Sequence, residues 1–171
     1  IVEFLGDMGL ALQVKDQAIG VMETEWAENR ADIKQNFIRQ QLSKVIDSLY
    51  SSPTRDKYRV RLERGLEAGT TEIYLTHYGM LEKLIGQNDD ESNAFWVPRD
   101  SEPELVAEML NRMMISLGVS KEKAQRLLAD EQAGRSYAKL LEDRQGNQIL
   151  LVGGGLKKAW RKTYIALDGA G

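Results

Sequence analysis

Strict alternation of apolar and charged side chains marks the stretch Asp56-Lys57-Tyr58-Arg59-Val60-Arg61-Leu62-Glu63-Arg64. A second run, Thr70 to Leu84, alternates in the same way, with Ile73 and Leu75 set between polar neighbours. Because successive side chains of a strand point to opposite faces, each run is typical of a half-buried β-strand. The short glycine-bearing segment Gly65 to Gly69 joins the two runs, so we predict an antiparallel hairpin.

The segments on either side of this hairpin predict further elements of the same unit. Gln13 to Ala27 alternates as one strand, and Ala94 to Val97 is expected to return briefly to the sheet. Apolar residues at helical spacing predict a helix over Lys34 to Tyr50, which ends before Pro53 because proline cannot donate to a continuing helix. Ile1 to Leu12 has weaker helical spacing and is expected to be the end of a longer helix.

A second strong helix is predicted from Pro103 to Leu117. Ser101 is the expected N-cap, with Glu104 as its capping-box partner, and Gly118 suits the C-terminal stop. The expected apolar stripe comprises Leu105, Met109, Leu110, Met113 and Leu117.

The last third of the chain predicts a polar helix over Ser120 to Gln132, a hairpin over Tyr137 to Val152 and a helix over Leu156 to Leu167. A hairpin and one helix do not bury a core unaided. We therefore expect them to pack on a neighbouring molecule or on the first unit. The expected fold class is α+β, with a first domain over residues 1–118, a helical linker over 119–135 and the beginning of a second domain over 136–171.

Composition excludes several classes of function. The chain has 171 residues, no Cys and one His, which leaves no disulfide scaffold, no Cys zinc site and no two-His metal site. Its formal charge of −3 argues against a general nucleic-acid binder, which usually carries a basic footprint. No stretch approaches the roughly 18 to 20 apolar residues that cross a bilayer. Because the chain opens on Ile1 inside an apolar pattern, we expect its natural start to lie upstream.

Four patterns are candidates for chemistry, and each has a stronger structural interpretation. His77 is a candidate base, but no Ser–His–Asp arrangement is readable near it. Gly153 to Gly155 precede a helix but match neither phosphate-loop spacing, so a flexible turn is preferred. Asp89 to Glu91 lack the spacing of an EF-hand loop, so a solvated loop is preferred. Glu23 and Glu25 share one strand face as a glycosidase pair sometimes does, although a wet sheet surface fits better.

Basic side chains concentrate in two places, a strand and a helix turn. They are Arg55, Lys57, Arg59, Arg61 and Arg64 in the first, and Lys157, Lys158, Arg161 and Lys162 in the second. A paired, solvated sheet face is the preferred interpretation of the first, and a protein interface is the second.

Several ordered segments resemble the NlpB/DapX outer-membrane lipoprotein family, the C component of the β-barrel assembly machinery. They are Val21-Met22-Glu23-Thr24-Glu25-Trp26-Ala27-Glu28-Asn29-Arg30, the stretch from Arg55 to Gly65, the stretch from Thr71 to His77, Trp96-Val97-Pro98-Arg99 with the helix after it, and Ile149-Leu150-Leu151-Val152 with the helix carrying Trp160. The resemblance covers nearly the whole chain. It is closest to β-proteobacterial members, which have an extra helix where Lys34 to Tyr50 lies here.

This resemblance implies two helix-grip domains, each an antiparallel sheet packed against helices. The first would be nearly whole, with a truncated N-terminal helix, and only the beginning of the second would be present. It implies a non-catalytic accessory lipoprotein that acts as a scaffold or adaptor in the insertion of outer-membrane barrels, with no cofactor. The contact with the D component and the lipidated Cys, which holds the family on the periplasmic side of the outer membrane, would lie before Ile1; exposure at the cell surface stays open.

The residues expected to contact protein partners are exposed polar and aromatic side chains: Arg59, Arg61 and Tyr74 on the sheet, and Trp160 and Arg161 on the last helix. The alternative function is a periplasmic module that binds a small molecule or a lipid in a cleft between the helix Pro103 to Leu117 and the sheet. An enzyme is the third alternative, and it would depend on His77.

Overall fold

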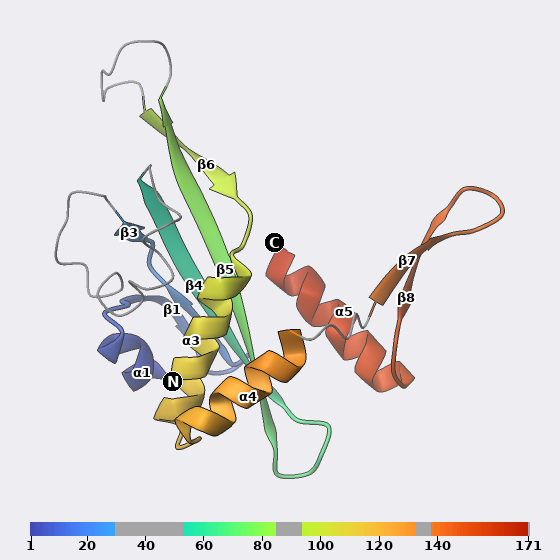
Figure 1. The fold of residues 1–171 in the computed structure, drawn as a ribbon, viewed down its shortest axis with the longest axis horizontal. Coiled ribbons are helices and arrows are strands. Elements are labelled where there is room, and N and C mark those ends of the chain that lie inside the picture. The colour runs from blue at the N-terminus through green and yellow to red at the C-terminus, as the bar shows by residue number, and fades with distance from the viewer. Residues whose placement is uncertain (30–52, 85–93, 133–137, 171) are drawn as a thin grey trace.

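The computed structural model describes residues 1–29, 53–84, 94–132 and 138–170 (Figure 1). The helix predicted over Lys34 to Tyr50 and the acidic loop around Asp89 to Glu91 lie outside the described residues.

The predicted central hairpin is confirmed. It consists of β4 (Thr54–Arg64) and β5 (Thr71–Leu84), which pair antiparallel in one continuous register. Strand β6 (Ala94–Arg99) pairs with β5, as expected, and completes one side of the sheet. On the other side, β2 (Val21–Thr24) and β3 (Ala27–Asn29) both pair with β4, and β1 (Leu12–Asp16) pairs with β2. All of these pairings are antiparallel, in the order β1-β2-β4-β5-β6 with β3 beside β4.

The prediction of one strand over Gln13 to Ala27 is wrong, because the chain turns back on itself between β1 and β2. The carboxylate of Asp16 accepts hydrogen bonds from the backbone N–H groups of Ala18 and Ile19. Gly20 then takes a left-handed conformation (φ 69°), which glycine adopts without steric cost. Alternation continues on both sides of this turn, so the period alone did not reveal it.

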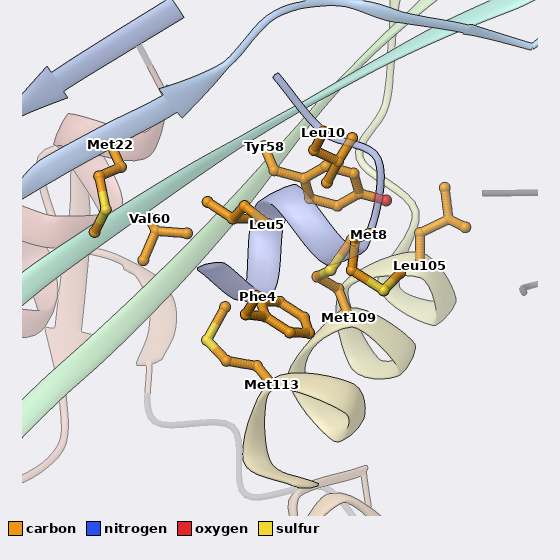
Figure 2. Packing of buried hydrophobic residues seen from close by; sticks show 10 residues of the cluster. All are labelled: Phe4, Leu5, Met8, Leu10, Met22, Tyr58, Val60, Leu105, Met109 and Met113. Atoms are coloured by element: carbon orange, nitrogen blue, oxygen red, sulfur yellow. The ribbon is translucent and has the colours of Figure 1, made fainter. Parts of the chain in front are cut away.

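One face of the sheet is buried, and the other face carries charged side chains. Tyr58 and Val60 of β4 are 1% and 0% exposed, and their inner face carries the core. Helices α1 (Val2–Asp7) and α3 (Pro103–Ser116) pack against this inner face (Figure 1). Figure 2 shows side chains of α1, of the segment that follows it, of α3 and of the sheet in a single cluster of ten residues: Phe4, Leu5, Met8, Leu10, Met22, Tyr58, Val60, Leu105, Met109 and Met113. The α+β class is therefore confirmed.

Helix α3 begins at Pro103, as predicted, and ends within one residue of the prediction, but its N-cap is a different residue. Gly118 has φ 93° beyond the last turn, which is the expected glycine stop. The N-cap, however, is Glu102 and not Ser101, and no side chain of the cap bonds to the helix. The backbone N–H of Glu102 donates instead to Nδ1 of His77 on β5 (3.3 Å), so a tertiary contact replaces the capping box. Leu117, at 55% exposed, lies beyond the buried part of the stripe.

The three C-terminal elements expected after α3 are present. Helix α4 (Lys121–Gln132) packs on α3 and buries Ala124 completely. Strands β7 (Ala138–Glu142) and β8 (Gln148–Val152) form a separate two-stranded hairpin, which stands away from the main sheet (Figure 1). Helix α5 (Leu156–Ala170) follows and returns to the main sheet.

Candidate protein interface

The outer face of the sheet is a layer of ion pairs. Arg55 of β4 donates to Glu28 on β3, with Nε 2.7 Å from the carboxylate. Lys57 donates to Glu23 on β2. Arg55 and Lys57 of the basic strand are therefore paired with acidic side chains on the neighbouring strands, as the preferred interpretation of a paired sheet face predicts.

The carboxyl-terminal turns of α5 bind this face through one carboxylate. Oδ1 of Asp168 lies 3.2 Å from Nη2 of Arg59, and Oδ2 lies 3.1 Å from Nη1 of Arg61. Arg59 also donates to the backbone carbonyl oxygen of Asp168 (3.1 Å). A cation beside the C-terminal carbonyls of a helix is favoured by the helix dipole. Each carboxylate oxygen of Asp168 thus accepts a hydrogen bond from a different arginine of β4.

Tyr164, one turn earlier on α5, makes a second contact with β4. Its hydroxyl accepts a hydrogen bond from Nη2 of Arg61 (2.8 Å), and the guanidinium carbon lies 5.0 Å from the ring centroid. The side chain of Arg61 is 13% exposed as a result. It combines an ion pair, a neutral hydrogen bond and a cation–π contact.

A second ion pair joins α5 to β5. Nη1 of Arg161 lies 2.9 Å from Oε2 of Glu72, and the hydroxyl of Tyr74 donates to the same carboxylate. The hydrogen bonds from Tyr74 and Arg161 hold the pKa of Glu72 below its ordinary value. Burial, followed by the hydrogen bond to Glu72, raises the pKa of Tyr74 to about 12. The phenol therefore stays protonated and remains a donor at any physiological pH.

Four of the five candidate interface residues come together at this contact, although they are not exposed as predicted. Arg59, Arg61, Tyr74 and Arg161 are half-buried and bond within the chain. The prediction placed these side chains on exposed surfaces, whereas α5 folds back over them. Sequence reasoning did not identify Asp168 as the partner of Arg59 and Arg61. One signal was available, since Arg161, Tyr164 and Asp168 recur at spacings of three and four and so share one helix face.

Trp160, the fifth candidate, lies on a different face of α5. It is 73% exposed and belongs to an apolar stripe with Leu156 and Leu167, which are 84% and 68% exposed. The hairpin before α5 is similar, because both of its strands carry exposed apolar residues: Leu140, Leu141, Ile149, Leu150 and Leu151. These side chains form an uncovered apolar surface within the described residues.

His77 lies at the centre of a buried polar network on the inner face. Its Nε2 lies 2.9 Å from Oδ1 of Asp56, while Nδ1 accepts from the backbone of Glu102. Asp56 also accepts from Arg99, and Arg99 donates to Glu102. Because Nδ1 is an acceptor, the ring hydrogen is on Nε2, and Nε2 donates the hydrogen bond to Asp56. Both ring nitrogens are occupied in joining β4, β5 and the start of α3, which favours the structural interpretation of His77.

The surroundings of the remaining candidates also favour their structural interpretations. Glu23 lies beside Lys57 on the outer face, and the chain bends at Gly154 with φ 113° before α5 begins. Met109 and Met113 belong to the core. Among the described parts of the chain, no three His, Asp or Glu side chains are grouped so that they would hold a metal ion.

The space between α3 and the sheet is filled. Leu105, Met109 and Met113 project from α3 at intervals of four residues and are 2%, 0% and 2% exposed. Phe4 and Leu5 of α1 occupy the same layer (Figure 2). A cleft between this helix and the sheet was the feature that would have supported a small-molecule or lipid binder, and the filled layer counts against it.

Comparison with known proteins decides the family. Residues 1–131 match the model of the outer membrane protein assembly factor BamC-like N-terminal domain. The chain belongs to the BamC-like family. The matched region runs from α1 to α4, so it contains the whole main sheet and both helices of its core.

Individual relatives extend the similarity beyond the BamC-like N-terminal domain. The chain is 42% identical over 170 residues to the outer membrane protein assembly factor BamC of Accumulibacter regalis. It is 43% identical over 171 residues to the protein of the same name from Thiobacillus denitrificans. An uncharacterized protein of Neisseria meningitidis serogroup B is 36% identical over 172 residues. These alignments cover 99%, 100% and 98% of the chain but 44%, 45% and 41% of the relatives, so the chain spans less than half their length.

No helix in the described ranges is both long enough and apolar enough to cross a membrane.

Proposed function

We propose that this chain is part of a non-catalytic accessory lipoprotein that acts as a scaffold or adaptor in the assembly of outer-membrane β-barrels. The observation that carries the proposal is its similarity, along essentially its whole length, to two proteins named outer membrane protein assembly factor BamC. The filled core and the doubly bonded His77 agree with a role that depends on surfaces rather than on a reaction.

We further propose that residues 1–118, the main sheet with α1 and α3, are a helix-grip domain, that α4 belongs to a helical linker over 119–135, and that residues 136–171 begin a second helix-grip domain. The match to the BamC-like N-terminal domain ends at residue 131, just before the β7–β8 hairpin. The exposed apolar stripe around Trp160 and the exposed leucines of the hairpin support this division, because such side chains are typical of a surface that packs against further structure.

The partners in this proposal are the other subunits of the β-barrel assembly machinery, with the D component bound through a segment upstream of Ile1. Attachment to the periplasmic side of the outer membrane would use a lipid on a Cys in that upstream segment. Neither contact involves the residues described here, so both are tested on the full-length lipoprotein.

Reconstitution tests the proposed activity. The other subunits of the machinery are placed in proteoliposomes, and the folding of a barrel substrate is followed with and without the full-length lipoprotein. We expect the lipoprotein to raise the folding rate or yield in the presence of the other subunits and to have no effect on empty vesicles. No change in rate or yield, or an equal effect on empty vesicles, would contradict the accessory role. A Met109→Ala variant, which loosens the core, serves as the destabilised control.

A further inference from the structure

The contact between α5 and the outer sheet face differs in kind from the packing of the core. The core contact of α3 is made of fully buried apolar side chains. The contact of α5 is made of charged and polar groups, and its apolar stripe is left in solvent. An amphipathic helix normally buries its apolar face. Helix α5 is therefore bound to the sheet by charge rather than by hydrophobic burial.

The charges of the sheet and of α5 are complementary, and each of the two surfaces carries both a basic and an acidic site. Arg59 and Arg61 of the sheet meet Asp168 of the helix, while Glu72 of the sheet meets Arg161 of the helix. Asp168 and Arg161 are seven residues apart and so lie two turns apart on one helix face. Exchanging the two ends of α5 would bring Asp168 to Glu72 and Arg161 to the two arginines. The pattern therefore specifies the direction of the helix as well as its position.

The geometry at Asp168 is that of a carboxylate receptor. Three donors from two arginines converge on its two side-chain oxygens and its carbonyl oxygen, at 3.1 to 3.2 Å. The side chains of Arg59 and Arg61 are 20% and 13% exposed, so water screens them less than it screens open surface pairs. Among the described residues, the buried Nε of Arg59 makes no hydrogen bond, and it lies 4.0 Å from Oε2 of Glu23.

We propose that the outer face of the sheet is a docking surface for an acidic helix end, and that α5 occupies it as a reversible latch centred on Asp168. The latch holds the C-terminal unit in one orientation on the BamC-like N-terminal domain. It opens by exchange of ion pairs for solvent, without disruption of the core on the inner face of the sheet. Contacts of this polar kind are typical of domain interfaces that move. The inference goes beyond the proposed function and does not depend on it.

The test measures the distance between two spin labels, which is straightforward because the chain has no Cys. The labels are placed at Gln17→Cys in the β1–β2 turn and at Lys157→Cys at the start of α5, both of which are exposed. We expect one narrow distance distribution at low salt. Asp168→Asn should broaden it and lower the docked population by about fivefold, the scale of one partly screened ion pair. Arg61→Gln should act in the same way, and the double variant should show less than the sum of the two effects.

The matched control is Asp7→Asn, which removes the same charge from the exposed end of α1 on the opposite side of the sheet. It should leave the distribution unchanged. Raising the salt to about 1 M, where the screening length falls to about 3 Å, should broaden the distribution of the unmodified chain. A broad distribution in the unmodified chain at low salt would overturn the proposal. So would a narrow distribution that survives Asp168→Asn, Arg61→Gln and high salt, because packing rather than charge would then hold α5. Circular dichroism of each variant shows that both units remain folded.

Discussion

Nε2 of His77 on β5 lies 2.9 Å from Oδ1 of Asp56 on β4, in the interior and diagonal to the residue pair Tyr58–His77 of the two neighbouring strands. The His77 side chain is completely buried and that of Asp56 is 3% exposed. The other ring nitrogen of His77, Nδ1, accepts a hydrogen bond from the backbone N–H of Glu102, the N-cap residue of α3. His77, which the sequence presented as a candidate base, therefore joins the start of α3 to the sheet through its two hydrogen bonds.

Replacing His77 should reduce stability rather than an activity. In His77→Ala, Asp56 loses a donor in a buried site and the N–H of Glu102 loses its acceptor. We expect the free energy of unfolding in urea to fall by about 2 to 4 kcal/mol. Thr76→Ala, one residue earlier on the outer face, should cost less than about 1 kcal/mol. Equal losses for both variants would show that the network does not stabilise the fold.

Truncation of Met109 tests the filled layer between α3 and the sheet. Because its side chain is 0% exposed, Met109→Ala leaves a cavity, and we expect a loss of about 2 to 5 kcal/mol in unfolding free energy. Ile115→Ala on the same helix removes a side chain that is 39% exposed and should cost much less. A small loss at Met109, together with binding of an apolar ligand by the unmodified chain, would revive the small-molecule alternative.

Gly20 is required by the turn that the sequence pattern did not reveal. Its φ is 69°, and a Cβ built there would lie 2.5 Å from the carbonyl oxygen of Leu62. Gly20→Ala should therefore lower the unfolding free energy by about 1 to 3 kcal/mol. Two control variants separate the causes. Gly69→Ala has a similar φ but no atom within 4 Å, and Gly6→Ala lies in α1 with open space around it.

Gly69→Ala reports the cost of backbone strain alone. Gly6→Ala should be stabilising by about 0.5 to 1 kcal/mol, because alanine is the better helix former. If the loss at Gly20 does not exceed the loss at Gly69, the close approach to Leu62 contributes nothing.

Acid should loosen the contact between α5 and the sheet. The pKa of Glu72 in the folded chain lies below its ordinary value of 4.5, because Tyr74 and Arg161 hydrogen-bond to the carboxylate. A lowered pKa means that the stabilisation is fully present above the ordinary value and is lost as the pH falls from there through the lowered value. The spin-label distance should broaden over that window. Glu72→Gln should remove this part of the pH dependence; an identical acid transition in that variant would assign the effect to another group.

Exposure of Trp160 tests whether residues 136–171 begin a second domain. In this chain its side chain is 73% exposed, so acrylamide should quench its fluorescence efficiently. Trp26→Phe and Trp96→Phe together isolate the signal of Trp160. In the full-length protein we expect markedly weaker quenching, because the apolar stripe should be covered. Equal quenching in the two proteins would contradict the domain assignment.

Local sequence patterns predicted the elements of this fold better than their contacts. Apolar residues recur at a constant spacing along the β4–β5 hairpin, α3 and α5. The bounds of each element were therefore predicted to within a few residues. The turn that ends at Gly20 was not predicted, because the apolar and polar residues alternate in the same way before and after it. The same limit applies to the N-cap of α3, since the acceptor for Glu102 comes from His77, 25 residues earlier in the chain.

The candidate interface shows the larger gap. Arg61 and Tyr164 are 103 residues apart in the sequence, and no local rule brings them together. The sequence showed which side chains are charged and on which strand face they lie. Which opposite charge meets each of them depends on how α5 returns to the sheet, and that follows only from the tertiary structure.

Isolation of the full-length lipoprotein from native membranes tests the proposed role most directly. The tagged protein is extracted in mild detergent, and the proteins that accompany it are identified and quantified beside a similarly abundant, unrelated outer-membrane lipoprotein. The proposal predicts recovery of the other subunits of the β-barrel assembly machinery, the D component included, in fixed proportion to the bait. Recovery of none of these subunits above the level of the unrelated lipoprotein would contradict it.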